Sequence, residues 1–384
     1  MKRQSEDPRA DWQHIVEQQG LIFHHTDNGA YWDESASYRL TAAQVDALEA
    51  ATNELQARCL EAGQHIIDRH LFDRFGIPEQ AVPAIMRSWN EEPPAISGRF
   101  DLVYDGVRPP KLLEYNADTP TSLIESAVVQ WFWKEDVHPG TDQFNSIHER
   151  LVAKWKELRG DLTGDRLYFA AVPDRQAEDL MTVSYLRETA MEAGLTTMPI
   201  TMGEIGWDSD DRVFRAPDGE PIRSIVKLYP WEWLVREPFG GFALESDVQW
   251  IEPIWKMLWS NKALLAVLWE LFPDHPNLVP AYLDAPRDLR RYVRKPKMSR
   301  EGANITIVDR GRTLLETGGD YGEDGYVYQQ FVEPVNAHHP IVGSWVIDGE
   351  AAGIGIRESS GLVTDNTSRF VPMLNGPVSS SYLN

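Results

Sequence analysis

Two short apolar runs separated by turn residues are the feature that most constrains the fold of this chain. Residues 100–104 and 111–115 are rich in apolar and aromatic side chains, and Asp105-Gly106 and Pro109-Pro110 lie between them. Strand-forming residues on both sides of turn-forming residues predict a β-hairpin.

The register of this hairpin decides which side chains share a face. If residues 105–110 form the connection, Asp101 lies opposite Glu114 and Arg99 lies opposite Asn116. Side chains two apart on a strand point to the same face, so these four gather together. Two carboxylates and an amide oxygen suit Mg²⁺, and the arginine could hold a phosphoryl group. The alternative that spacing alone leaves open is a solvated hairpin face with an Arg–Asp pair.

Composition and charge exclude several classes of protein. The chain has 384 residues and a formal net charge of −22, which argues against a nucleic-acid backbone as the main partner. Cys59 is the only cysteine, so no intrachain disulfide forms, as expected in a reducing compartment. The opening residues MKRQSEDPRADW do not read as a secretory signal, and no run of about 18 apolar residues predicts a membrane span. We expect a cytoplasmic protein, and the sequence does not fix its oligomeric state.

A basic segment, residues 287–300, stands out in this acidic chain. It carries seven lysines and arginines and leads into the small, polar stretch 298–305, which contains Gly302. A flexible loop that covers a phosphate has this composition. A solvated basic turn is the alternative.

The rest of the chain has a mixed α/β pattern. Apolar spacing predicts a long helix over 41–73 with Cys59 on its buried face, where the thiol would not be a nucleophile. Glu178 and Asp179 begin a predicted helix after a strand, and either bind a cationic substrate group or favour the helix dipole. We further expect helices over 121–134, capped by Thr119-Pro120-Thr121, 176–193 and 252–271, and strands over 167–172, 196–200, 224–228, 326–332, 339–347 and 352–357, the last three in one antiparallel sheet.

Short motifs along the chain, taken in order, resemble the synthetase part of the glutathionylspermidine synthase family and most of all its stand-alone acid–amine ligases. The resemblance runs from about residue 10 to the C-terminus. Its motifs are Gly98-Arg99-Phe100-Asp101, Glu114-Tyr115-Asn116-Ala117-Asp118, Trp231-Glu232, Asn261-Lys262-Ala263, Lys295-Pro296, Tyr328-Gln329-Gln330 and Gly355-Ile356-Arg357.

This resemblance implies an ATP-grasp fold of the α+β or α/β class with a pre-ATP-grasp-like subdomain. Approximate subdomains would be 10–160 with the metal and phosphate hairpin, 161–250 with the substrate-binding α/β unit, and 251–384 with the ATP lysines and the lid. The implied activity is an ATP- and Mg²⁺-dependent carboxylate–amine ligase that works through an acyl phosphate. Its partners would be a small acid, such as a glutathione-like peptide or an amino acid, and a small amine.

The resemblance also implies roles for particular residues. Asp101, Glu114 and Asn116 match magnesium ligands, and Arg99 matches the arginine that stabilises the transferred phosphoryl group. The residues that match ATP-contacting positions are Arg99, Phe100, Asp101, Lys262, Lys295, Glu301, Gly302, Gln329, Gln330, Phe331, Val332, Arg357, Leu362, Val363 and Thr364.

The substrate side matches less well. Thr119 and Thr121 replace two glutathione-binding serines, while Glu178 matches a glutathione-contacting acid and Asp179 a polyamine-contacting acid. Trp233 stands where the family has a glutathione-binding threonine. Arg369 stands, by spacing, where it has an acid that contacts spermidine. Because an arginine there would repel a polyamine, the sequence favours an amino acid or another zwitterionic amine.

Two other classes compete with a ligase. A glycoside hydrolase would use the 14 tryptophans for sugar stacking and paired acids for catalysis, but has no use for Lys262, Lys295 and Arg357. A non-catalytic nucleotide-binding protein would retain the ATP site and lack turnover.

Overall fold

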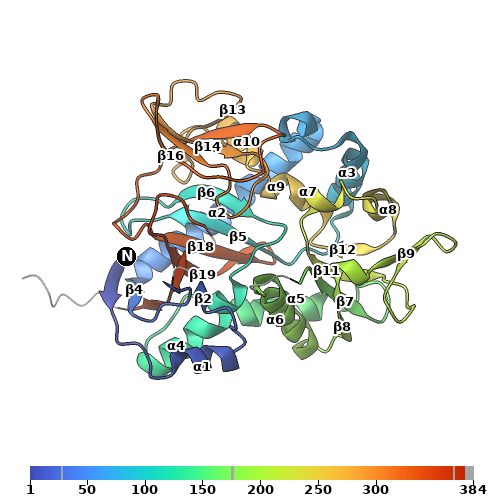
Figure 1. Ribbon diagram of the computed structural model, residues 1–384, viewed down its shortest axis with the longest axis horizontal. Helices are drawn as coiled ribbons and strands as arrows, with labels where there is room; N and C mark the ends of the chain where they lie inside the picture. Colours follow the sequence, from blue (N-terminus) through green and yellow to red (C-terminus); the bar gives the residue numbers. More distant parts are fainter. Residues whose placement is uncertain (27–28, 174–176, 366–367, 377–384) are drawn as a thin grey trace, which may run out of the picture.

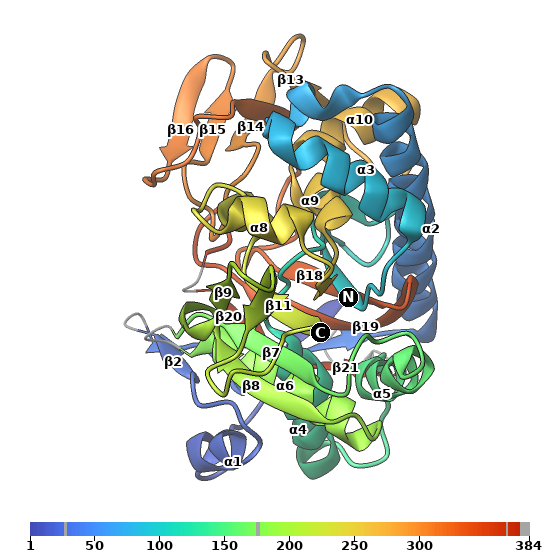
Figure 2. The same cartoon turned by 90° about the vertical axis from the view of Figure 1, so that its right-hand side faces the viewer.

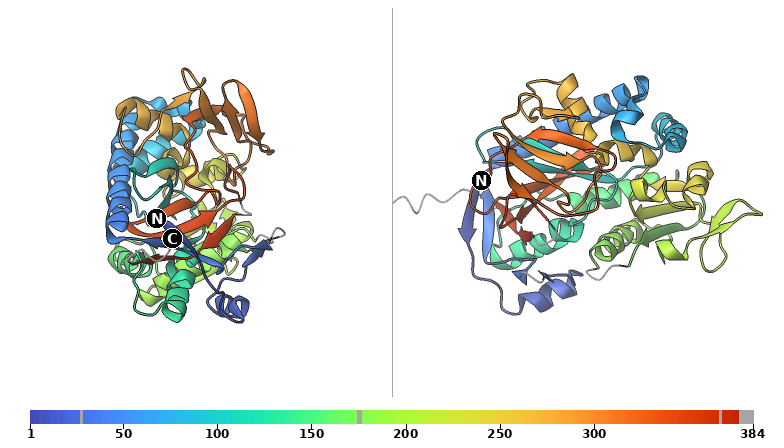
Figure 3. Two further views of the ribbon diagram at one scale, coloured as in Figure 1. Left: turned by 90° about the vertical axis from the view of Figure 1, so that its left-hand side faces the viewer. Right: turned by 45° about the horizontal axis from the view of Figure 1, so that its top comes forward.

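The computed structural model describes residues 1–26, 29–173, 177–365 and 368–376. Within these residues, two five-stranded sheets and one four-stranded sheet form the framework. The central sheet lies between the other two in Figures 1 and 2, and the left view of Figure 3 keeps this order. These three sheets are the frame in which the candidate site is described below.

The central sheet joins distant parts of the chain. Its order is β20-β19-β18-β5-β6, and all its neighbouring strands are antiparallel. The strands are β5 Ser97–Val103, β6 Lys111–Asn116, β18 Ile341–Ile347, β19 Glu350–Glu358 and β20 Arg369–Val371.

The predicted hairpin is confirmed, together with its register at the polar end. Arg99 pairs with Asn116 and Asp101 with Glu114, after which an irregularity shifts the pairing so that Leu102 lies opposite Leu112. The expected pairing holds where the polar face forms and shifts by one residue beyond it.

The second sheet is also antiparallel and has the order β13-β17-β14-β15-β16. It appears in orange in Figure 1. Its strands are β13 Ala281–Leu283, β14 Arg291–Pro296, β15 Thr306–Asp309, β16 Arg312–Glu316 and β17 Tyr326–Gln330. The expectation that the strand from Tyr326 shares a sheet with the two strands after it was wrong, because β17 pairs with β13 and β14 instead.

The third sheet is parallel, with the order β12-β11-β7-β8. Its strands and the helices beside it are β7 Leu167–Ala171, β8 Thr197–Thr201, β11 Ser224–Leu228, β12 Gln249–Ile251, α5 Ile147–Leu158 and α6 Glu178–Glu192. This confirms the predicted βαβ character. The predicted start of the helix at residue 176 lies outside the described residues.

The long predicted helix is α2, Ala42–Asp68. The Thr41 side chain accepts a hydrogen bond from the Gln44 N–H while the Gln44 side chain bonds back to the Thr41 N–H, a capping box that fixes the start. The helix ends before residue 73 because His70 has a left-handed φ of 52°, and a 3₁₀ turn, Leu71–Phe75, follows. Cys59 is buried, as expected, and burial raises the pKa of its thiol.

The helix predicted over 121–134 starts later and is irregular. Ser122 has a φ of 63°, which prevents a regular start at Thr121. A π-helical turn, Glu125–Val129, leads into α4, Gln130–Val137, without a side-chain cap. The predicted cap by Thr119-Pro120-Thr121 was therefore wrong.

The apolar helix predicted over 252–271 is broken into three pieces. They are a 3₁₀ turn Ile254–Lys256, α9 Met257–Ser260 and α10 Ala263–Leu271. At the break, the extended Asn261 donates from Nδ2 to the carbonyl of Phe75 and accepts from the N–H of Ala263. This interruption places Lys262 at the start of α10.

The remaining elements surround the three sheets. A small sheet has the order β1-β4-β21, and no described helix is long and apolar enough to cross a membrane. The further elements are β1 Lys2–Ser5, α1 Trp12–Gln18, β2 His25–Thr26, β3 Gly29–Ala30, β4 Ala36–Leu40, α3 Val82–Glu91, β9 Gly206–Asp208, β10 Val213–Arg215, α7 Trp231–Leu234, α8 Gly240–Glu245 and β21 Met373–Asn375, with 3₁₀ turns at Glu79–Ala81 and Met202–Glu204.

Candidate active site

A single cleft of about 300 Å³ gathers almost all of the residues predicted to act. Its lining comes from the central sheet, from β14 and β17, and from the start of α6. The predicted residues among those that line it are Arg99, Asp101, Glu114, Asn116, Thr119, Thr121, Glu178, Asp179, Trp233, Lys262, Lys295, Glu301, Gly302, Gln329, Gln330, Phe331, Val332, Arg357, Leu362, Val363 and Thr364.

Phe100 is the predicted ATP contact whose side chain lies elsewhere. It is fully buried and stacks on Tyr115 at 3.8 Å between ring centroids. Because neighbouring residues on a strand point to opposite faces, Phe100 faces the core while Arg99 and Asp101 face the cleft. Any contact of Phe100 with a nucleotide would have to come from its backbone.

Asp101 is held between two arginines. Arg99 donates from Nε to Oδ1 at 2.7 Å and from Nη2 to Oδ2 at 3.1 Å, and Arg357 donates from Nη2 to Oδ2 at 2.9 Å. Arg99 also donates from Nη1 to the carbonyl of Thr121 at 2.5 Å. Burial disfavours the charged guanidinium, but Asp101 outweighs burial and the pKa of Arg99 is raised.

Two lysines face the second carboxylate. Lys262 Nζ lies 3.1 Å from Glu114 Oε2, and Lys295 Nζ donates to the carbonyl of Leu113 at 3.0 Å. Burial raises the pKa of Glu114, but Lys262 and then Lys295 overcome it and lower this pKa to about 2. Burial lowers the pKa of Lys295 to about 8. Glu114 and Asp101 are the negative charges that act on Lys295, and they share the cleft with four cations, Arg99, Lys262, Lys295 and Arg357, so this part of the cleft is suited to a bound anion.

Gln329 holds Lys295 in place. Its Oε1 accepts from Lys295 Nζ at 2.8 Å and its Nε2 donates to the carbonyl of Leu112 at 2.9 Å. These two hydrogen bonds connect β17 to β14, which carries Lys295, and to β6, which carries Glu114. Gln329, which the resemblance predicts to lie beside a nucleotide base, thus orients Lys295, which the resemblance predicts to contact ATP.

The donor set on the hairpin fits a magnesium ion. Asn116 Nδ2 lies 3.4 Å from Asp101 Oδ2 and 3.5 Å from Glu114 Oε1, so the three side chains converge. Among the described residues, no three His, Cys, Asp or Glu side chains are grouped to hold a metal. Two carboxylates and an amide oxygen nevertheless match Mg²⁺, which uses few protein oxygens and completes its shell with phosphates and water.

An apolar slot adjoins this charged region. Ile305, Ile307 and Phe331 form a small buried cluster, with Val293 and Val363 packed against it. All five line the cleft. A slot of this kind suits a flat, weakly polar ring, while the neighbouring cations suit its phosphates.

The basic loop predicted to cover a phosphate lies over the cleft, and Arg300 anchors it. Arg300 donates to Thr119 Oγ1 at 2.6 Å and to Glu232 Oε1 at 3.0 Å, and its guanidinium lies 5.6 Å from the ring of Trp233. A Cβ at Gly302 would lie 2.6 Å from Val363, so the loop touches the opposite wall.

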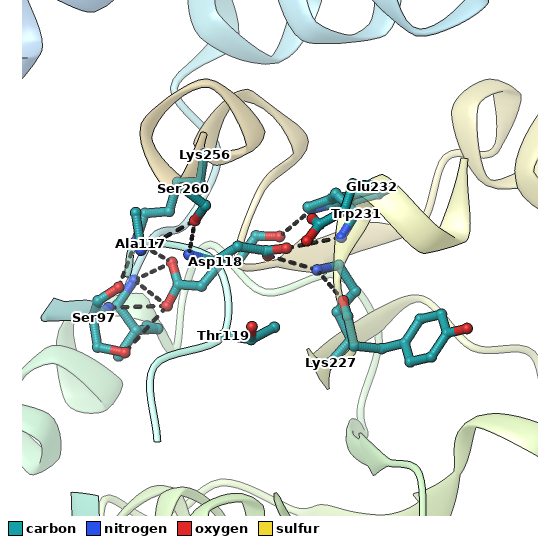
Figure 4. A network of polar contacts seen from close by, with 12 residues as sticks. Ser97, Ala117, Asp118, Thr119, Lys227, Trp231, Glu232, Lys256 and Ser260 are labelled. Atoms are coloured by element: carbon teal, nitrogen blue, oxygen red, sulfur yellow. Dashed lines mark hydrogen bonds and ion pairs between the residues drawn. The ribbon is translucent and has the colours of Figure 1, made fainter. Parts of the chain in front are cut away.

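A buried ion pair fixes the two segments to which Arg300 donates, and Figure 4 shows it between Thr119 and Glu232. Lys227 Nζ donates to Asp118 Oδ1 at 2.7 Å, and both side chains are fully buried. Asp118 Oδ2 also accepts from the N–H of Trp231 at 2.8 Å. The chain segments that carry Thr119 and Glu232 are thereby fixed to each other.

Another wall of the cleft, beyond the lysines and arginines, is acidic. Glu178, Asp179 and Asp365 line the cleft, together with Tyr31 and Ser122. Arg369, which we expected to repel a polyamine, is not among the lining residues. Its guanidinium lies 3.0 Å from Asp33 Oδ2 and 3.3 Å from Glu358 Oε2 and is neutralised there.

Several lining residues had no signal in the sequence. Tyr31 comes from a chain segment that only the fold brings to the cleft, and no motif surrounds it, whereas Asp365 directly follows the predicted stretch that ends at Thr364 but was not itself a candidate. Arg300 was visible only as part of the basic segment. Ser122 adjoins the predicted Thr121, but the sequence pattern does not reveal that Ser122 has a left-handed φ.

The antiparallel sheet that bears Lys295 and the hairpin that bears Asp101 enclose the cleft between them, as in an ATP-grasp fold. The solved structure of a glutathione synthetase like-effector from Globodera pallida, in its apo form, has a similar fold. It aligns with a TM-score of 0.54 over 95% of this chain and 98% of that chain, at 10% sequence identity.

The family model for the glutathionylspermidine synthase preATP-grasp region matches residues 3–374, and the chain belongs to this family. A Haemophilus influenzae protein named "Putative acid--amine ligase" is 39% identical over 90% of this chain and 91% of its own length. Trypanothione synthetase of Crithidia fasciculata is 29% identical over 83% of this chain and 55% of its own length. The bifunctional glutathionylspermidine synthetase/amidase of Escherichia coli is 26% identical over 88% of this chain and 59% of its own length. The chain thus spans a little over half of these two relatives, and the family places it among ATP-dependent ligases that form amide bonds.

Proposed function

We propose that this protein is an ATP- and Mg²⁺-dependent acid–amine ligase that forms an amide through an acyl phosphate, with a glutathione-like peptide or an amino acid as the acid. One observation carries the proposal. Four cations, Arg99, Lys262, Lys295 and Arg357, converge on the two carboxylates of one hairpin, inside a cleft that also has an apolar slot.

The chemistry needs such a site. A carboxylate reacts poorly with an amine because its leaving group would be an oxide ion. Attack of the carboxylate oxygen on the γ-phosphorus of ATP forms a C–O–P linkage, breaks the bond to ADP and makes phosphate the later leaving group. Positioning and neutralisation of charge on the phosphoryl oxygens supply most of the rate of such a transfer.

The residues of the cleft divide these tasks. Arg99 is already held by Asp101 and the Thr121 carbonyl, so its guanidinium is oriented before a substrate binds. Lys262 would exchange its contact with Glu114 for phosphate oxygens, and Lys295, whose charge also acts on Glu114, would bind them beside it. Asp101, Glu114 and Asn116 would hold Mg²⁺, which neutralises phosphate charge when bound.

The loop that carries Arg300 would keep water from the acyl phosphate. Its contacts with Thr119, Glu232 and the Val363 segment support a role as a lid, since they join both walls of the cleft. Water that reached an acyl phosphate would return it to the free acid.

The first test is thermal stability with and without MgATP. A ligand at a hundredfold excess over its Kd stabilises a protein by about 2.7 kcal/mol, so a true site gives a clear shift. Asp101→Asn should lose the Mg²⁺-dependent part of that shift. Asp105→Asn is the matched control, because it makes the same change in the same hairpin outside the cleft. If MgATP raised the thermal stability of both variants equally, the hairpin would not hold the metal ion.

The second test is ATP-dependent phosphate release with pairs of acids and amines, starting with glutathione and amino acids as acids. Phosphate release that requires both partners supports the ligase. ATP binding without release for any pair would support a nucleotide-binding protein instead.

A further inference from the structure

A buried carboxylate, Glu125, lies directly behind the acidic wall of the cleft. It belongs to the π-helical turn Glu125–Val129 and is 1% exposed. Its Oε1 accepts a hydrogen bond of 2.7 Å from the hydroxyl of Tyr31. Its Oε2 is buried and has no hydrogen-bond partner among the described residues. A buried carboxylate with an unpartnered oxygen is costly and asks for an explanation.

Tyr31 and Ser122 connect this carboxylate to the cleft. Both residues line the cleft, whereas Glu125 does not. The hydroxyl groups of Tyr31 and Ser122 lie 3.2 Å apart. A proton that arrives at the Tyr31 oxygen from the cleft can therefore be passed on to Glu125 by the hydrogen bond already present.

The charges around Glu125 leave it able to accept that proton near neutral pH. Burial and then the negative charge of Glu178, from the start of α6, raise its pKa to about 7, against the opposing influence of Tyr31 and of Arg357 on β19. Burial, followed by the negative charges of Glu125 and Glu178, raises the pKa of Tyr31. Tyr31 is thus a neutral hydroxyl that both donates and accepts, and Glu125 is a base matched to neutral conditions.

We infer that Tyr31 and Glu125 form the route by which the amine substrate loses its proton before it attacks. The inference rests on the proposed ligase function and adds a catalytic residue, Tyr31, and a positioning residue behind it, Glu125. The ammonium group of the amine would lie beside Tyr31 and Ser122, facing Glu178, where the negative wall favours a cation.

The proton balance is complete. An N–H bond of the ammonium breaks and its proton goes to the Tyr31 oxygen, while the Tyr31 hydroxyl proton passes to Glu125 and forms a carboxylic acid. The freed lone pair attacks the acyl carbon, the C–O bond to phosphate breaks, and phosphate leaves with the bonding electrons. The second N–H proton goes to the leaving phosphate, which becomes hydrogen phosphate.

Hydroxylamine separates this step from formation of the acyl phosphate. It is uncharged at neutral pH, so it traps an acyl phosphate without needing to be deprotonated, whereas spermidine is a charged alkylamine. With glutathione or an amino acid as the acid, Glu125→Gln and Tyr31→Phe should form hydroxamate at nearly the wild-type rate. Amide formation with an alkylamine should fall about 100-fold at pH 7, the loss expected when a general base is removed.

The pH profile distinguishes proton transfer from a structural role. Wild-type amide formation should rise through about pH 7 as Glu125 ionises. In Glu125→Gln that inflection should disappear and the rate should climb steadily with the fraction of free amine. Tyr115→Phe is the matched control, since its hydroxyl donates to Gln56 in the core and lies away from the cleft.

Each outcome decides between the two proposals. Equal loss of hydroxamate and amide formation in Glu125→Gln, or an unchanged pH profile for amide formation, would overturn the proton route and leave the ligase standing. A wild-type protein that makes no hydroxamate with any acid would instead refute the ligase proposal, and the proton route with it. Thermal unfolding of each variant checks that it is folded.

Discussion

Gly343 lies directly opposite Asp101 in the central sheet, and a Cβ on Gly343 would lie 2.9 Å from Cδ of Arg99. The stem of Arg99 therefore crosses β18 where a side chain is missing. Since Arg99 is 5% exposed and is bound to both Asp101 and Thr121, it has little freedom to move aside. The absence of one methyl group on β18 helps to position the guanidinium that faces the cleft.

Gly343→Ala should therefore impair turnover more than it impairs folding. Overpacking of this kind costs about 1–3 kcal/mol of stability, and displacement of Arg99 should lower kcat about 100-fold with a smaller change in the Kd of ATP. Phosphate release and chemical denaturation check the two parts. Gly241→Ala is the control, because nothing lies within 4 Å of its Cβ position. Unchanged kcat in Gly343→Ala would show that Arg99 tolerates the added methyl group.

Lys295 should make ATP binding depend on pH in the alkaline range. Burial lowers its pKa to about 8 in the free protein, so the lysine loses its charge as the pH rises through that value. Because phosphate oxygens favour the charged form, the Kd of MgATP should increase above about pH 8. Isothermal titration between pH 7 and pH 10 measures this change.

Lys295→Arg should keep its charge over the same range, so its Kd should change little with pH. Lys111→Arg is the control, since Lys111 lies on β6 outside the cleft-lining set and bonds to the carbonyls of Pro276 and Leu278. A wild-type Kd that stays constant through pH 9 would contradict the role given to Lys295.

The buried pair of Asp118 and Lys227 should matter chiefly when one partner is missing. Asp118→Asn leaves a fully buried ammonium group without its counter-charge and should destabilise the protein by about 3–5 kcal/mol. Asp118→Asn combined with Lys227→Met should be less destabilising than Asp118→Asn alone. Urea denaturation of the single and double variants measures the coupling, and additive losses would argue that the pair is not a unit.

Arg369 tests a difference between the sequence expectation and the fold. From spacing alone, Arg369→Asp should improve polyamine use. In the structure it would instead place a third acid beside Asp33 and Glu358, and we expect a loss of about 1–2 kcal/mol of stability, discounted for the partial exposure of Arg369.

The amine selectivity of Arg369→Asp should then be unchanged, whereas Asp365→Asn, on the cleft wall, should raise the KM of a cationic amine. Steady-state kinetics with spermidine and with a neutral amine compare the two variants. A gain of spermidine activity in Arg369→Asp would support the expectation from the sequence that Arg369 repels a polyamine.

The hairpin could be predicted from the sequence because its evidence is local. Alternating side chains and a short turn region fix the pairing of Asp101 with Glu114, and the same holds for the helix that begins after Thr41. The break at Asn261 could not be predicted, since it depends on a hydrogen bond to Phe75, far away in the sequence. That break positions Lys262, so part of the site geometry depends on a contact that no local pattern contains.

The acidic wall shows the same limit. Glu178 was a candidate because it follows a strand of a parallel sheet. Tyr31 and Glu125 had no comparable signal, because their roles depend on burial and on each other. Sequence resemblance gave Asp179 as a substrate contact and placed Arg369 against the amine; the fold puts Asp179 in the cleft and Arg369 outside it.

The order of the central sheet has a consequence for how the protein is made. β5 pairs on one side with β6, a few residues later in the chain, and on the other with β18, which begins only at Ile341. Until β18 has been synthesised, one edge of β5 therefore has no partner strand. Over the same period Arg357, which comes still later in the chain, is not in contact with Asp101. Long-range pairing of this kind is slow and leaves an exposed edge meanwhile. Nucleotide affinity should therefore appear abruptly and late in synthesis, after β18 and β19 have joined the sheet.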